Sequence, residues 1–142
     1  MFTSDERTVS LLKTALAHLC AAVFCVFFGA VYERFSHEVY SYWMIYAFAL
    51  PLTLGTLPML SLALWGRMLP GQVSLWLWNA GIAALTVGCI FRGVLDIYGT
   101  TNRLWAAYPI VGGALLALGL VSYLLFGWKR KTEREITVLP AA

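Results

Sequence analysis

The side chains that could do chemistry gather in two short segments, residues 31–43 and 91–105, each at the end of a long apolar run. Their charged and imidazole members form one candidate polar cluster: Glu33, Arg34, His37, Arg92 and Asp96. Glu33 and His37 are four residues apart, as are Arg92 and Asp96, so each pair would lie on one face of a helix. A single histidine with carboxylates suits several cations weakly and none distinctively. We therefore expect a polar surface and no defined metal centre.

Three interpretations of these two segments stay open. Tyr, Trp and Arg side chains are typical of the headgroup level of a membrane, so the segments could anchor two helix ends. Tyr and Arg are also enriched at binding hot spots, so the segments could dock a partner protein. The third interpretation is a ligand or metal site built on Glu33, His37, Glu38 and Asp96.

The two segments also share a pattern. Starting at residues 28 and 91, each reads aromatic-x-small-Val-x-acid-x-aromatic. A parallel repeat of two helical hairpins would place the two acids, Glu33 and Asp96, symmetrically about an axis along the membrane normal. This arrangement predicts two ion pairs between helices: Arg92 with Glu33 and Arg34 with Asp96.

Within the apolar runs, the one deep ionisable residue is His18, about 7 Å beyond Lys13 by helix rise. An ionisable residue at membrane depth is a functional candidate, here as a proton relay or a metal or haem ligand. A neutral histidine bonded to a backbone carbonyl or a hydroxyl is the simpler interpretation. Asn79 lies about two turns inside the third run and could bond across helices. His18 and Asn79 are therefore the candidate intramembrane polar site.

The second apolar run carries a predicted helix break at Pro51, Gly55 and Pro58. Each proline removes a backbone donor and frees the carbonyl four residues earlier, at Ala47 and Leu54. Side-chain hydroxyls nearby could satisfy such groups: Thr53, Thr56 and Ser61. A broken helix can surround a transported ion or substrate, or it can be a tolerated kink in a structural helix.

The elements that carry these residues follow from composition. The chain has 142 residues, 61% hydrophobic and 12% charged, whereas soluble domains are about 45–50% apolar and about 25% charged. A bilayer core needs about 20 consecutive apolar residues per helix. Charge-poor runs of that length predict spans at 13–32, 43–65, 72–93 and 108–128. The expected fold is all-α: a single membrane domain, 1–142, folded as a bundle of four transmembrane helices.

The Lys and Arg residues predict the orientation of this bundle. Seven of the ten fall on the side that holds both termini: Arg7, Lys13, Arg67, Lys129, Arg130, Lys131 and Arg134. Cytoplasmic loops carry the excess of positive charge, so both termini and the basic tail 129–142 are expected in the cytoplasm. The polar segments would then face outward.

Small residues recur on single faces of three runs. They are Ala15, Ala22 and Gly29 in the first run, Gly81, Ala84 and Gly88 in the third, and Gly112 with Gly119 in the fourth, where Gly113 and Ala117 are also four residues apart. Small residues let helix backbones approach closely in lipid. These faces therefore pack the bundle internally or pair it with another protein.

No catalytic constellation of recognisable spacing and no phosphate-binding glycine loop is present in the sequence, so we expect no enzyme activity and no cofactor. The favoured hypothesis is an accessory or assembly subunit of a membrane complex, in the bacterial cytoplasmic membrane. Its partners would be the lipid bilayer and another membrane protein or a second copy, with no nucleic acid. A small oligomeric transporter or channel is the alternative, and a quinone- or haem-linked redox subunit is the third hypothesis.

Overall fold

The computed structural model describes residues 4–36, 38–65 and 70–138, and its description of side chains ends at residue 125. All regular structure in these ranges is helical. The elements in chain order are α1 (Ser4–Arg34), α2 (Tyr42–Ile45), the π-helical turn η1 (Pro51–Thr56), α3 (Leu57–Trp65), α4 (Gln72–Ile97), the 3₁₀ turn η2 (Arg103–Ala106) and α5 (Ala107–Val138).

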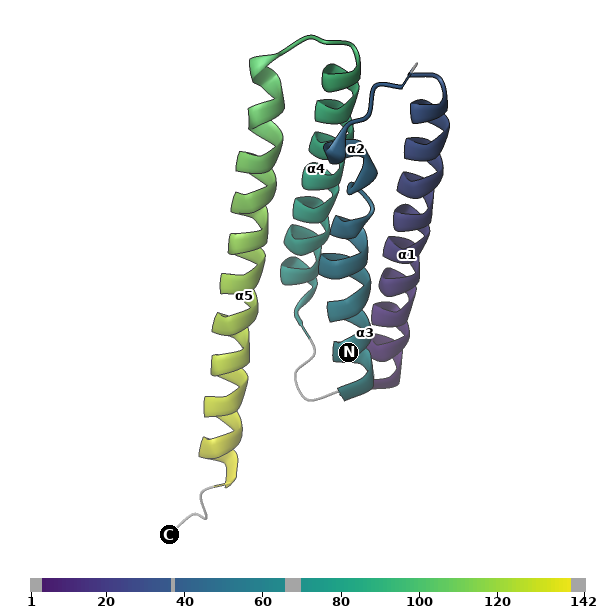
Figure 1. Ribbon diagram of the computed structural model, residues 1–142. Helices are drawn as coiled ribbons and strands as arrows, with labels where there is room; N and C mark the ends of the chain where they lie inside the picture. The colour runs from purple at the N-terminus through teal and green to yellow at the C-terminus, as the bar shows by residue number, and fades with distance from the viewer. Residues whose placement is uncertain (1–3, 37, 66–69, 139–142) are drawn as a thin grey trace.

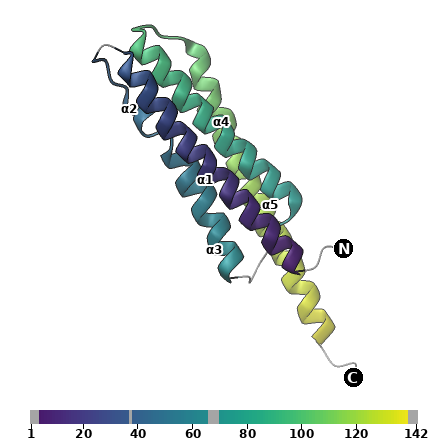
Figure 2. The same cartoon turned by 90° about the vertical axis from the view of Figure 1, so that its right-hand side faces the viewer.

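These helices form an up-and-down bundle (Figure 1). α1 and α4 run in one direction, and α3 and α5 run in the other, as both views show (Figures 1 and 2). α1 begins and α5 ends at the same end of the bundle. We call the opposite end, which carries the connections 35–41 and 98–102, the loop end.

Three helical segments are long and apolar enough to cross a membrane: Thr8–Arg34, Gln72–Ile97 and Arg103–Leu125. They contain 27, 26 and 23 residues, whereas a span needs about 20. The first, third and fourth apolar runs of the sequence are thus confirmed as long membrane-type helices.

The second apolar run, predicted as a span over 43–65 with a helix break at its prolines, is not one continuous helix. α2 ends at Ile45, a turn follows, and the apolar helix that comes next is Pro51–Trp65. Its two parts, η1 and α3, are six and nine residues long, which gives about 22 Å at the α-helical rise. The physical reason is Pro51, which has no N–H to continue the helical bonding of the residues before it.

Helix α4 is the centre of the packing. It contacts α2, η1, η2 and α5, whereas α5 contacts only α4 and η2 among the described elements. Gly81 and Gly112 bring the α4 and α5 backbones together: a Cβ on Gly112 would lie 3.0 Å from the Gly81 carbonyl oxygen. On the other side of the bundle, α1 packs on η1 and α3 around Leu11, Ala15 and Met59.

Met44 of α2 fills the space between α1 and α4 at the loop end. It is almost fully buried, and its atoms lie against both Gly29 and Gly93. A Cβ on Gly93 would come within 2.7 Å of the Met44 Cβ. Most of the predicted small residues therefore pack internally. On α5 this holds for Gly112 and Gly119, whereas nothing lies within 4 Å of a Cβ built on Gly113.

Two neighbouring glycines of α5 provide a matched test of this packing. Gly112→Ala should destabilise the bundle, because overpacking costs about 1–3 kcal/mol and the gain in helix propensity is only about 0.5–1 kcal/mol. Gly113→Ala adds a methyl in open space, so it should keep the gain in helix propensity without the overpacking cost. Reversible unfolding in mixed detergents measures both variants. Equal stabilities would contradict the close approach of α4 and α5.

Candidate functional site

The predicted intramembrane residues meet in the structure. The His18 Nε2 of α1 lies 3.0 Å from the Asn79 Oδ1 of α4, in a half-buried position. An amide oxygen only accepts hydrogen bonds, so Nε2 carries the proton and donates it in this contact. The partner is thus a side-chain amide on another helix, where the sequence predicted a backbone carbonyl or a hydroxyl.

The residues of the predicted helix break lie next to this contact. Gly55 of η1 packs directly on the imidazole: a Cβ there would lie 2.7 Å from Nδ1 and 2.8 Å from the His18 Cβ. Pro51 begins η1 and is buried, while Pro58 lies in the first turn of α3. His18, Gly55 and Asn79 therefore join α1, η1 and α4 at one point.

The carbonyls of the broken segment are satisfied by side chains. The Trp78 Nε1 donates to the Leu54 carbonyl at 2.8 Å, which is the carbonyl that Pro58 was predicted to free. The Thr56 hydroxyl donates to the Pro51 carbonyl oxygen at 3.3 Å. The same hydroxyl lies 3.5 Å from the Ala15 carbonyl oxygen of α1. Thr53 donates to the Ala49 carbonyl and Ser61 to the Pro58 carbonyl, so neither bonds the carbonyls that the prolines were predicted to free. We call His18, Gly55, Thr56, Trp78 and Asn79 the histidine cluster.

The histidine cluster contains one titratable side chain and an amide. Within the described residues, no group of three or more His, Cys, Asp or Glu side chains is placed to hold a metal ion. With Nε2 donating to Asn79, the ring is held in one orientation against the η1 backbone. This arrangement can stabilise the π-helical turn η1, and it places the Nε2 proton of His18 at a fixed position.

The second predicted site, at the loop end, is assembled around Asp96. Its Oδ1 lies 2.9 Å from the Arg92 Nε, and its Oδ2 accepts a hydrogen bond from the Ser41 hydroxyl at 3.1 Å. The Nε–H itself is not aligned with an acceptor, so the contact is an ion pair without a directed hydrogen bond. The Arg92 guanidinium also lies 5.1 Å from the ring centroid of Trp105. Sequence reasoning missed Ser41, which is 2% exposed.

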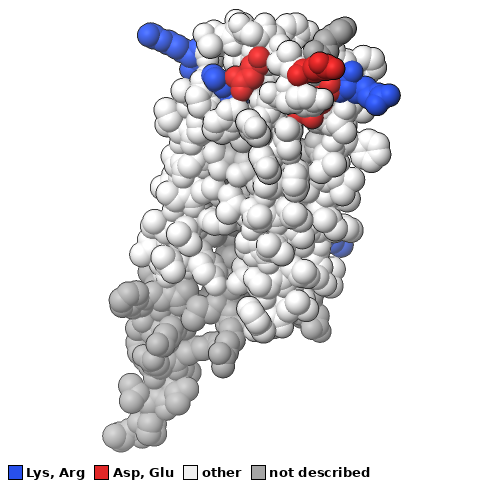
Figure 3. Space-filling view, viewed as in Figure 1, with Lys and Arg blue, Asp and Glu red and all other residues white. Residues whose placement is uncertain are grey.

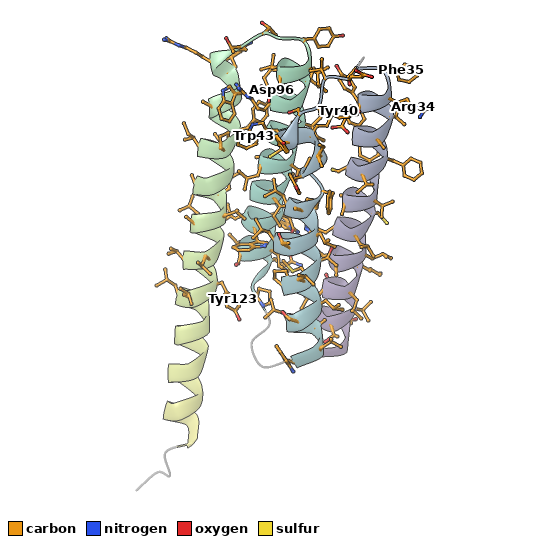
Figure 4. All side chains as sticks on the ribbon, in the orientation of Figure 1. Arg34, Phe35, Tyr40, Trp43, Asp96 and Tyr123 are labelled. Atoms are coloured by element: carbon orange, nitrogen blue, oxygen red, sulfur yellow. The ribbon has the colours of Figure 1, made fainter. Side chains whose placement is uncertain are left out.

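The two ion pairs predicted between helices are wrong. Arg92 pairs with Asp96 on its own helix, because residues four apart are adjacent on a helix face and need no second helix to meet. The Glu33 Oε1 is buried and has no hydrogen-bond partner among the described residues. Arg34 is exposed at the end of α1, well separated from Asp96 in Figure 4. His37 lies outside the described residues.

On the face seen in Figure 3, charged side chains gather at one end. In the space-filling view, the red and blue side chains form a band at the loop end, and the long flank below is almost entirely uncharged (Figure 3). Exposed aromatic residues accompany this band, including Phe35, Tyr40, Tyr42 and Tyr98. The loop end thus combines charged and aromatic side chains, as expected for a headgroup region or a docking surface.

Comparison with protein-family models, curated proteins and solved structures finds no match for this chain.

The contact between Gly55 and His18 yields a rescue experiment. Gly55→Ala should destabilise the bundle by about 1–3 kcal/mol, since the new methyl overlaps the imidazole. In a His18→Ala background the ring is gone, so the same change should cost at least about 1 kcal/mol less. Unfolding free energies of the two single variants and the double variant give the coupling. Simple additivity would show that the imidazole does not press on η1.

Proposed function

We propose that the chain is a non-catalytic integral membrane protein that works as an accessory or assembly subunit of a membrane complex. In this proposal it crosses the bacterial cytoplasmic membrane four times, with both termini in the cytoplasm. The broken segment α2–η1–α3 makes the second crossing together with its turn. The excess of Lys and Arg on the side of the termini supports this orientation.

The observation that carries the proposal is the one-sided packing of α5. Among the described elements it contacts only α4 and η2, and 11% of its most apolar stretch is buried, against 28% for α4. Gly113 and Ala117, four residues apart, are exposed on the face of α5 that α4 leaves open. Helices in lipid gain little from hydrophobicity when they associate, so small residues that admit a second backbone are typical of their interfaces.

The loop end supplies a second surface for the same partner. Arg92 is held by Asp96 and by the face of Trp105, whose ring lies 5.8 Å from that of Trp43. Rigid aromatic and arginine side chains lose little entropy on binding and are enriched at hot spots. A partner that packs along α5 would meet Trp43 and Trp105 at its outer end.

Bulk added at Gly113 should abolish this association. Gly113→Leu has room in the isolated chain but blocks a second backbone, so association should weaken roughly tenfold or more. Ala114→Leu is the matched control, because it adds bulk about 100° round the same helix. Mass measurement of complexes purified in mild detergent compares both with the natural chain. A strictly monomeric natural chain with no co-purifying protein would count against the proposal.

A small transporter or channel is the second candidate, and the histidine cluster favours it. A discontinuous helix beside a membrane-embedded histidine is the kind of element that lines transport sites.

Flux assays separate the two candidates. If the chain transports ions or small solutes, proteoliposomes should show flux that falls in both His18→Ala and Pro51→Ala while the fold is kept. Pro109→Ala, at the exposed start of α5, should leave the flux unchanged. If the natural chain gives no flux above that of empty liposomes, the transporter hypothesis is wrong.

A further inference from the structure

A groove lies between the halves of α3, α4 and α5 that are remote from the loop end. Its volume is about 170 Å³, and its walls include Leu62 of α3, Leu75 and Trp78 of α4, and Leu120 and Tyr123 of α5. Among the described elements, α3 and α5 make no contact with each other, and the groove occupies the space between them. Tyr123 points from α5 toward this side (Figure 4).

The polar atoms in these walls already have partners. The Ser74 hydroxyl donates to the Gly119 carbonyl at 2.7 Å, and the Trp78 Nε1 donates to Leu54. The Tyr123 side chain also has an interaction of its own. The remaining surface is hydrocarbon, so an occupant gains by packing and not by hydrogen bonding.

With the cationic run of α5 at the headgroup level, the groove would lie at the depth of the lipid tails of one leaflet. α5 continues as one helix through residues 129–131, which read Lys-Arg-Lys. At the α-helical rise, this cationic run is about 9 Å beyond Tyr123 and about 15 Å beyond Gly119. Half of a bilayer core is also about 15 Å thick. A molecule with a negative head at the cationic run and a tail in the groove would therefore match both regions.

We infer that the groove between α3, α4 and α5 holds one acyl chain of an anionic phospholipid whose headgroup lies beside the Lys-Arg-Lys run of α5. The tail completes the packing that α3 and α5 leave open. The charge near the headgroup selects the lipid, since polybasic segments at a membrane surface attract anionic lipids strongly. The lipid is a structural ligand, independent of the partner proposed for the Gly113 face.

Lipid retention by the full-length chain tests this inference. The protein is reconstituted with phosphatidylglycerol and phosphatidylcholine, extracted in mild detergent, and weighed with its bound lipid. One retained phosphatidylglycerol is expected on the natural chain. Leu120→Trp fills the groove and should lose it, whereas Leu118→Trp adds equal bulk on another exposed flank of α5 and should retain it.

A charge variant tests the headgroup. Replacing Lys129, Arg130 and Lys131 with Gln should lower the preference for phosphatidylglycerol over phosphatidylcholine by roughly one to two orders of magnitude. Leu62→Trp repeats the groove test from α3, in case Leu120→Trp does not fold.

Three results would overturn the inference. They are a natural chain that retains no phospholipid, groove variants that retain it like the natural chain, and a retained mass that belongs to a protein.

Discussion

A backbone carbonyl or amide in hydrocarbon must find its hydrogen-bond partner inside the protein, because lipid supplies none. The second apolar run breaks this condition twice, at Pro51 and Pro58. At the second break, within the widened turn that Pro51 begins, the Trp78 indole restores it by donating to the Leu54 carbonyl. That bond fixes α4 against η1. Asn79, the next residue of α4, then reaches His18 on the far side of η1.

The central place of α4 follows from the same contacts. α4 bonds the broken segment through Trp78 and α1 through Asn79, and its glycines admit α5. α1 packs on η1, α2 and α3, and it reaches α4 through the bond between His18 and Asn79. Because α5 has one helical neighbour over most of its length, it leaves open both the Gly113 face and the groove beside α3.

The sequence predicted the features that depend on composition and on local spacing. Three long helices, the internal role of Gly81 and Gly112, and the freed carbonyl of Leu54 all follow from hydropathy, residue size and the chemistry of proline. His18 lies about 7 Å and Asn79 about two turns inside their runs, which was a signal that their depths are similar. Their contact could not be predicted, because it depends on the rotation of α1 and α4 about their axes.

Other features depend on which of several possible contacts forms, and the sequence does not determine this. The predicted bond between Arg92 and Glu33 needed two helices to meet, whereas Asp96 lies one turn away from Arg92 at a separation fixed by helix geometry. Ser41 was missed because a short hydroxyl in a loop carries no spacing signal, although it is buried against Asp96. The loop before Pro51 was missed because apolar residues continue through it without a break in composition.

The short length of the helix Pro51–Trp65 has a consequence for how the chain is made. At about 22 Å it falls short of a bilayer core, and it carries a carbonyl, that of Leu54, whose donor is on Trp78. During synthesis, residues 51–65 leave the ribosome before Trp78 does. An insertion machinery that released this segment into lipid at once would release it with that carbonyl unpaired. In the proposed four-span topology, stable insertion of the broken segment would therefore require α4, and the two would enter the membrane as a unit.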